Sequence, residues 1–376
     1  MPLSNQRRPT ARLVAASFER RLRRSSASAG GLADRPLAVS STDGWFHYSQ
    51  RMTTTGPRDD APATSGPGLV MPIGGAEDKS GRMTILRDVV RLAGGSGARM
   101  VVISTASSLG DEVTNAYLAL FGQLGVRDVR GVRPESRVQA ADPMIIEVVD
   151  QATAIFMTGG NQTKLAALVV GTPLGDAILA AHRRGALIAG TSAGASIVSE
   201  HMVSFGAEGA TPKFRIGQVS QGLGLLAGAI VDQHFTQRNR FGRLLALVAA
   251  NPAQLGIGID EDTAAIVSPA GLLEVRGRGV VTVVDGSEIL TTAYTATGTQ
   301  PLMISGLKLH TLPRGAVFDL DRRVLVSAPG LEDTSRGQTV RTLADVPEGT
   351  QPRPRRIAAE GAHATTQELR RRVASD

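Results

Sequence analysis

Residues 185–199, GALIAGTSAGASIVS, decide the fold class of this chain. Four apolar residues at 186–189 predict a short buried strand, and the small residues that follow predict a sharp turn and then a helix. The turn itself, GTSAG at 190–194, matches G-x-S-x-G, the pattern of a nucleophile elbow. Such a turn strains its serine, so positions 190 and 194 must carry almost no side chain. The stretch therefore predicts an α/β sheet that presents Ser192 at the end of a strand.

An elbow of this kind also prepares a place for developing negative charge. It aims the Ala193 amide and the start of the following helix at the position where an oxyanion would form. The same five residues would also suit an ordinary Gly- and Ala-rich connection between a strand and a helix. The pattern alone does not decide between the two interpretations, so the rest of the chain has to.

The composition is that of a globular chain with room for one large domain or two ordinary ones. It has 376 residues, 42% of them hydrophobic, and no cysteine. The lack of cysteine excludes disulfides, a thiolate nucleophile and Cys-based metal sites, so covalent catalysis needs another nucleophile. No apolar run approaches the roughly 18 to 20 residues that cross a bilayer, and the N-terminus lacks the apolar core of a secretory signal. We therefore expect a cytoplasmic protein without a membrane partner.

The net charge of +7 is concentrated towards the N-terminus. Residues 1–66 hold ten arginines against five acidic residues, and residues 331–376 hold eight arginines against seven. The middle of the chain has a net charge of only +1. The globular part therefore offers no net-charge argument for binding nucleic acid. Within the first segment, VAASFERRLRR at 14–24 predicts a short basic helix that could touch an anionic surface.

Strand and helix signals alternate from residue 69 onwards, which is typical of a mostly parallel sheet with helices on both faces. Shorter β-rich pieces follow residue 263. We predict one doubly wound α/β domain over residues 67–330, with an antiparallel β addition at its C-terminal end. Residues 1–66 and 331–376 lack any sustained apolar period and predict flexible tails. The predicted strands are 69–73, 100–103, 129–132, 153–157, 186–189, 225–231 and 256–259, and the predicted helices are 83–93, 112–124, 144–149, 174–182 and 241–248.

A serine nucleophile needs a base within hydrogen-bond reach and a group that orients the base. Of the six histidines, His234 stands in VDQHF, at the carboxyl end of a predicted strand, where open α/β sheets place their sites. Three acidic residues, Asp260, Glu261 and Asp262, follow the predicted strand 256–259 in the same way. The pattern alone does not decide which of these three faces the site.

Two further segments complete the candidate site. FMTGGNQ at 156–162 is another predicted strand that ends in a glycine pair, so Gly160 is a candidate second oxyanion donor, although a plain Gly-Gly turn has the same sequence. Arg238, Arg240 and Arg243 begin the helix after His234. Guanidinium groups bind carboxylates through two parallel hydrogen bonds, so these arginines favour an acidic or carboxylate-bearing substrate. The alternative is a solvated helix face.

Five segments in order resemble the cyanophycinases of serine peptidase family S51: MPIGGAED (71–78), FMTGGNQ (156–162), AGTSAGAS (189–196), DQHFTQRNRFGRL (232–244) and GIDEDTA (258–264). The resemblance spans roughly residues 69–325, and its most specific part is DQHF-x-x-R-x-R-x-x-R. It implies that Ser192 is the nucleophile, His234 the general base and Glu261 the acid that orients the base. It implies a fold similar to the class I glutamine amidotransferases. The substrate-binding roles that it implies fall on Gln162, Asp232, Gln233, Arg238, Arg240 and Arg243.

The sequence also departs from this family in two places. Asn161 stands where the family more often has Asp, and the long N-terminal segment is not part of the family core. The substitution leaves the charge balance of the loop at 158–162 open.

The resemblance implies a hydrolase that acts on cyanophycin, a poly-aspartate backbone with arginine on each β-carboxyl. Ser192 would attack a backbone aspartyl carbonyl, the Ala193 and Gly160 amides would hold the oxyanion, and β-Asp-Arg dipeptides would leave through an acyl-enzyme. A homodimer is implied, and no metal or cofactor. Two alternatives stay open: the same triad acting on other aspartyl or β-aspartyl peptides, or a non-catalytic anion-binding module. The retained Ser, His, Glu and Arg argue against the module.

Overall fold

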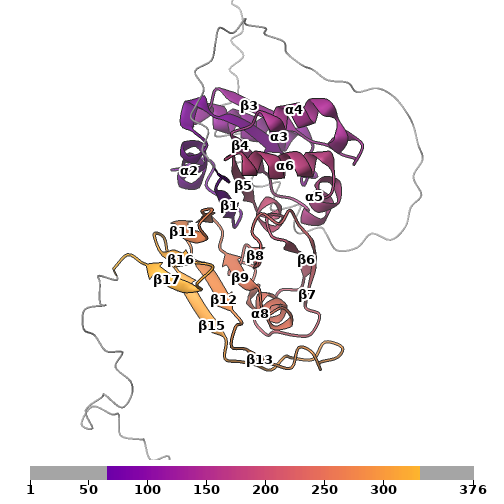
Figure 1. The fold of residues 1–376 in the computed structure, drawn as a ribbon, viewed down its shortest axis with the longest axis vertical. Coiled ribbons are helices and arrows are strands. Elements are labelled where there is room, and N and C mark those ends of the chain that lie inside the picture. Colours follow the sequence, from indigo (N-terminus) through magenta and orange to yellow (C-terminus); the bar gives the residue numbers. More distant parts are fainter. Residues whose placement is uncertain (1–65, 331–376) are drawn as a thin grey trace, which may run out of the picture. The chain divides into compact units, whose positions relative to one another are not determined.

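The structure of the chain, a computed structural model, describes residues 66–330 (Figure 1). The predicted tails, 1–66 and 331–376, lie outside the described residues except for Gly66, and so does the predicted basic helix at 14–24. What was inferred about these segments stays a prediction.

The larger sheet is parallel on one side of β1 and antiparallel on the other. Its nine strands follow the order β17-β16-β11-β10-β1-β5-β4-β2-β3. Strands β1, β5, β4, β2 and β3 pair in parallel, whereas β10, β11, β16 and β17 continue the sheet antiparallel. The predicted doubly wound α/β sheet with an antiparallel addition is confirmed. The strands are β1 Val70–Ile73, β2 Arg99–Ile103, β3 Asp128–Val132, β4 Ala154–Met157, β5 Leu187–Thr191, β10 Thr263–Val267, β11 Leu272–Gly277, β16 Val317–Asp319 and β17 Val324–Ser327.

Helices cover both faces of the parallel strands, because successive residues of a strand point to opposite sides. On β2, Met100 and Val102 belong to the core beneath α2 and α3, whereas Val101 and Ile103 belong to the core beneath α5 and α6. Figure 1 shows these helices around the parallel strands. The helices are α2 Thr84–Leu92, α3 Asp111–Gln123, α4 Pro143–Asp150, α5 Gln162–Val169, α6 Pro173–Arg183, α7 Ala193–Ser196 and α8 Phe241–Ala250.

The strands that precede His234 and Glu261 form a second sheet. In it β8 and β9 pair in parallel, and β12 and β15 continue antiparallel in the order β15-β12-β9-β8. The sequence pattern predicted β8 and β9 but assigned them to the single large sheet. They cannot pair with β1, because both of its edges are occupied, one by β5 and the other by β10. The strands are β8 Ala229–Gln233, β9 Leu255–Ile259, β12 Val281–Asp285 and β15 Lys308–Leu312.

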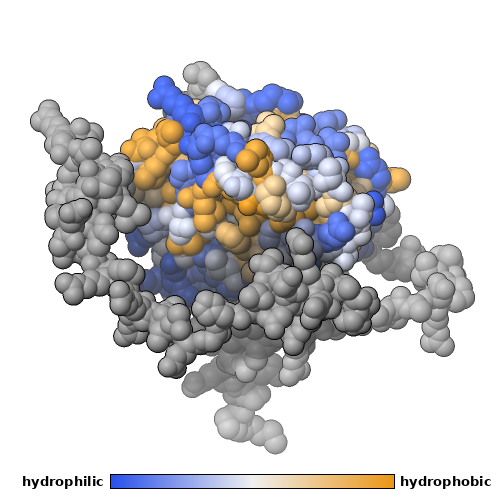
Figure 2. Space-filling view, turned by 90° about the horizontal axis from the view of Figure 1, so that it is seen from below, coloured by the Kyte–Doolittle hydropathy of each residue, from blue (hydrophilic) through white to orange (hydrophobic). Residues whose placement is uncertain are grey.

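Two short hairpins and α5 were not predicted from the sequence. The hairpins are β6–β7, His201–Gly206 with Gly217–Gln221, and β13–β14, Leu290–Thr291 with Ile304–Ser305. Large apolar residues are exposed near the second hairpin, among them Leu290 and Met303. Figure 2 shows one face of the molecule, on which apolar and polar residues are mixed. Within residues 66–330 no single helix is long and apolar enough to cross a membrane, and only α5 and α6 counted together, bent by 91°, pass that test.

Candidate active site

Ser192 occupies a strained turn between β5 and α7. Its φ is 53° and its ψ is −105°, a conformation that residues with a side chain rarely adopt. The flanking glycines are required by close backbone contacts. A Cβ at Gly190 would lie 2.2 Å from the carbonyl oxygen of Gly194, and a Cβ at Gly194 would lie 2.2 Å from the carbonyl oxygen of Met157. The turn therefore has the geometry expected of a nucleophile elbow.

The glycine pair after β4 packs directly against this elbow. A Cβ on Gly159 would lie 3.4 Å from the Cβ of Ser192. Gly160 has a φ of 143°, and a Cβ there would lie 2.1 Å from the carbonyl oxygen of Ala106. A side chain at Gly160 would therefore clash with the neighbouring loop, and a Cβ at Gly159 would be in van der Waals contact with Ser192. Gly160 follows Gly159 directly, and its role as an oxyanion donor stays a prediction.

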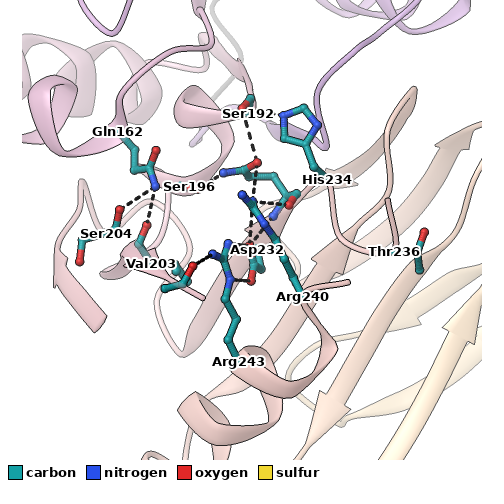
Figure 3. Close-up of polar contacts among 12 residues, drawn as sticks. Gln162, Ser192, Ser196, Val203, Ser204, Asp232, His234, Thr236, Arg240 and Arg243 are labelled. Carbon is teal, nitrogen blue, oxygen red and sulfur yellow. Dashed lines mark hydrogen bonds and ion pairs between the residues drawn. The ribbon is translucent and has the colours of Figure 1, made fainter. Parts of the chain in front are cut away.

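His234 lies between Ser192 and Glu261. Its Nε2 is 2.9 Å from Ser192 Oγ, and its Nδ1 is 2.7 Å from Glu261 Oε1. Figure 3 shows the imidazole beside Ser192, and His234 directly follows the last residue of β8. With Glu261 accepting the proton on Nδ1, the lone pair of Nε2 faces the serine hydroxyl. This arrangement can take a proton from Ser192 Oγ and hold the resulting imidazolium.

The surroundings of His234 favour the neutral imidazole. Burial lowers the pKa of His234 below its ordinary value, and the positive charges of Arg238 and Arg240 lower it further. The hydrogen bond and the charge of Glu261 act in the opposite direction. A general base must be unprotonated to work, so this balance keeps His234 ready at neutral pH.

The glycine pair after β1 positions the imidazole, a role that the sequence analysis did not assign. The carbonyl oxygen of Gly74 accepts a hydrogen bond from the backbone N–H of His234 at 2.8 Å. A Cβ on Gly75 would lie 2.3 Å from Cε1 of the imidazole. His234 itself has a φ of 47°, so its backbone is strained as well. The signal in the sequence was a strand that ends in Gly-Gly, which resembles the other two site segments.

Of the three acidic residues that the pattern left open, only Glu261 contacts His234. Asp260 is buried and accepts hydrogen bonds from the backbone and hydroxyl of Thr236 at 3.1 and 2.7 Å. Asp262 accepts the backbone N–H of Asp78 at 3.0 Å. Their carboxylates therefore hold loops around the site. Glu261 is held in place by its own backbone N–H, which donates to Oε1 of Gln237 at 2.9 Å, a contact that no sequence pattern predicted.

Gln233 connects the serine to Arg240. Its Oε1 accepts a hydrogen bond from Arg240 Nη1 at 2.9 Å and lies 3.4 Å from Ser192 Oγ. Arg240 Nη1 also donates to the carbonyl oxygen of Gln233 at 2.7 Å. Burial lowers the pKa of Arg240 to about 10, and Asp232 opposes that shift, so the guanidinium stays charged at neutral pH. Arg240 therefore fixes the residue beside the nucleophile.

Asp232 and Arg243 form a fully buried ion pair. Arg243 donates from Nε to Oδ2 at 2.6 Å and from Nη2 to Oδ1 at 2.5 Å. Asp232 is 0% exposed and Arg243 is 2% exposed. Arg243 Nη1 donates to the carbonyl oxygen of Gly206 at 3.1 Å, which ties the pair to the β6–β7 hairpin. Both groups are thus occupied within the protein. The family resemblance implied substrate-binding roles for them, and no local sequence pattern predicts this pairing.

The remaining predicted site residues differ in whether their side chains already have hydrogen-bond partners within the protein. Gln162 donates from Nε2 to the carbonyl oxygens of Ser204 and Val203 at 2.7 and 3.3 Å. Asn161 caps α5, since its Oδ1 accepts the backbone N–H of Lys164 at 3.0 Å, as an Asp there would. Arg238 is partly exposed, and its guanidinium makes no hydrogen bond or ion pair with any of the residues from 66 to 330.

The described part of the chain holds no cluster of three or more His, Asp or Glu side chains that could bind a metal ion. The polar groups converge instead on Ser192 Oγ, through His234 and Gln233.

Comparison with known proteins gives consistent matches. The model of peptidase family S51 matches residues 69–273. Cyanophycinase of Geminocystis herdmanii is 39% identical over 248 residues, which are 65% of this chain and 91% of that protein. Cyanophycinase of Trichormus variabilis is 39% identical over 261 residues, 69% of this chain and 88% of that protein. A crystal structure of a peptidase from an acI-B1 actinobacterium matches 66% of this chain and 98% of its own, at TM-score 0.47 and 22% identity.

Proposed function

Since the chain belongs to peptidase family S51 and is a serine-type peptidase, we propose that it degrades cyanophycin and releases β-Asp-Arg dipeptides through an acyl-enzyme. The observation that carries the proposed mechanism is the contact chain from Ser192 Oγ to His234 Nε2, 2.9 Å, and from His234 Nδ1 to Glu261 Oε1, 2.7 Å. The names of the relatives supply the substrate.

In the proposed first half-reaction Ser192 Oγ attacks the carbonyl carbon of a backbone aspartyl bond. His234 Nε2 takes the hydroxyl proton, and the Ala193 and Gly160 amides stabilise the oxyanion. The tetrahedral intermediate then expels the amine, which receives the proton from His234. The products of this step are the ester on Ser192 and the shortened or released peptide.

In the second half-reaction water takes the place of the serine hydroxyl. His234 removes a proton from the water as it attacks the ester carbonyl, and then returns the proton to Ser192 Oγ. Glu261 keeps Nδ1 protonated and stabilises the imidazolium in both halves, without becoming protonated itself.

For recognition of substrate we propose Arg238 as the principal contact with a carboxylate. It is the one of the three arginines whose guanidinium has no partner within residues 66–330, whereas Arg240 and Arg243 hold Gln233 and Asp232. Arg238 also lies close enough to His234 to lower its pKa. Asp232 cannot serve the arginine side chain of the substrate while it remains paired and 0% exposed.

The decisive experiment adds the purified chain to a suspension of insoluble cyanophycin. We expect clearing of the suspension and release of β-Asp-Arg, measured by mass spectrometry. Ser192→Ala is the matched control and should clear nothing. If other aspartyl or β-aspartyl peptides are cleaved while cyanophycin is not, the substrate assignment is wrong and the triad assignment stands. If Ser192 also fails to react with a fluorophosphonate, the chain has no activated serine and the mechanism is wrong.

We also propose that residues 67–330 form the catalytic domain and that the chain is a homodimer. A chain that begins near residue 66 should stay soluble and active, and light scattering should give twice the mass of one chain. Aggregation or loss of activity in the shortened chain would place residues before 66 in the folded domain.

A further inference from the structure

A buried carboxylate, Glu77, lies behind the nucleophile elbow. It belongs to the loop after β1, and its exposed fraction is 0%. Its Oε2 accepts a hydrogen bond from Thr191 Oγ1 at 2.5 Å, and its Oε1 accepts one from the hydroxyl of Tyr117 at 2.5 Å. Lys79 Nζ lies 3.0 Å from Oε1. Neither the triad nor the proposed recognition of substrate uses this carboxylate.

Glu77 is ionised in spite of its position. Burial opposes the charge, but the positive charge of Lys79 and the hydrogen bonds from Thr191 and Tyr117 outweigh it and lower the pKa of Glu77 below its ordinary value. Apolar residues of similar volume commonly stabilise a core as well as a buried ion pair does. Stability alone therefore does not explain a carboxylate at this place.

The contact with Thr191 connects Glu77 to the reactive serine. Thr191 immediately precedes Ser192 and lies opposite Ile73 in the parallel pairing of β5 with β1. The backbone N–H of Ser192 donates to the carbonyl oxygen of Ile73 at 3.0 Å. A strained residue such as Ser192 keeps its conformation only when the surrounding contacts fix it. The hydrogen bond from Thr191 to Glu77 is charge-assisted, and it fixes the residue directly before the strained Ser192.

The same loop also holds the general base. Gly74 accepts the backbone N–H of His234, and Gly75 lies against the imidazole. Glu77 lies three residues after Gly74 in the loop that follows β1, and its carboxylate accepts a hydrogen bond from Thr191. One short segment, residues 74–77, therefore contacts both the strand that carries the nucleophile and the residue that carries the base.

We propose that Glu77 is a positioning residue, which acts through Thr191 to keep Ser192 Oγ within hydrogen-bond reach of His234 Nε2. It touches neither substrate nor the reacting atoms. Its effect should appear in the reactivity of the serine and in kcat, and only weakly in KM. This inference rests on the proposed role of Ser192, but not on the identity of the substrate.

The test uses substitutions at Thr191, which leave the charge on Glu77 in place. Thr191→Val removes the hydroxyl and keeps the shape, and Thr191→Ser restores the hydroxyl. We expect Thr191→Val to lower kcat and the rate of labelling by a small fluorophosphonate by about 10- to 100-fold, with KM changed less than about threefold. Thr191→Ser should recover most of both rates. Glu77→Gln should behave like Thr191→Val if it folds.

Thr172→Val is the matched control for the loss of a buried hydroxyl. Thr172 caps α6, is 4% exposed, and donates from Oγ1 to the carbonyl oxygen of Val169 at 2.7 Å, away from the elbow. The Thr172→Val variant should have a lower Tm, with kcat and the rate of fluorophosphonate labelling unchanged. If Thr191→Val labels at the wild-type rate, Glu77 serves stability only and the inference is wrong. A wild-type chain that does not label at all overturns the proposed nucleophile and the inference together.

Discussion

The Asp232–Arg243 pair offers the sharpest test of how the arginines divide their work. Arg243→Met keeps most of the side-chain volume and removes the charge, which leaves a carboxylate that is 0% exposed without its bidentate partner. Removing one partner of a buried pair costs about 3–5 kcal/mol. Arg240 Nη1 stays 3.5 Å from Asp232 Oδ1 and partly compensates. We therefore expect a loss near the lower end, about 3 kcal/mol.

The full chain is unfolded in urea, and circular dichroism monitors the loss of structure in residues 66–330. Arg238→Met is the matched control, because its guanidinium has no partner in the part of the chain that the structure describes. We expect its free energy of unfolding to change by less than about 0.5 kcal/mol. Its kcat/KM on cyanophycin should fall about 10- to 100-fold through loss of a charge-assisted contact, while labelling by a neutral phosphonate persists.

A second variant separates a lost pair from a stranded charge. Asp232→Asn combined with Arg243→Met removes both charges, so it should be more stable than Arg243→Met alone. If Arg243→Met is as stable as the wild type but loses activity on cyanophycin, Arg243 contacts substrate and the reasoning from the buried pair is refuted. Equal loss of stability in Arg238→Met and Arg243→Met would refute the division between the two arginines.

Three further predictions concern the triad. Ser192→Ala should keep the fold, checked by its unfolding curve, and lower kcat by a factor on the order of 10⁶. Glu261→Gln should severely lower kcat in a turnover assay, because Glu261 is the one of the two residues that contacts His234. Asp260→Asn should mainly lower Tm, because Asp260 binds Thr236 instead. On the acid side, kcat/KM should rise with pH as His234 loses its proton. The midpoint of this rise should lie below about pH 6.5, because burial lowers the pKa of His234. Arg238→Ala should move the midpoint to higher pH, and an unmoved midpoint would contradict the assigned charge effect.

Much of the fold followed from local pattern. The apolar run at 186–189 and the small residues after it predicted β5, the turn and α7, because an elbow that tight excludes side chains at 190 and 194. The sequence did not predict the second sheet. Whether β8 and β9 join β1 depends on which strand already occupies its edge, and β10, which does so, lies later in the chain. No local pattern carries that information.

The site was predicted as a set of segments rather than as a set of contacts. Each of its three Gly-Gly or G-x-S-x-G segments follows a strand, so their convergence at one edge could be expected. The local pattern could not decide between Glu261 and Asp260, because long-range contacts determine where neighbouring side chains in a turn point, and only the family resemblance implied Glu261. Asp260 is held by Thr236, and Glu261 by Gln237.

The different contacts of the three arginines could not be predicted from the sequence either, and they bear on which substrate groups the site can bind. They look equivalent in the sequence, but a buried carboxylate must be paired. Asp232 on β8 is paired with Arg243, and Arg240 lies 3.5 Å from it. Of these three arginines, only Arg238, two residues before the cap of α8, has a guanidinium without a partner among residues 66–330. We therefore expect Arg238 to contact one carboxylate near the scissile bond. Recognition of an arginine side chain must then come from acceptors other than Asp232, because that carboxylate is already satisfied.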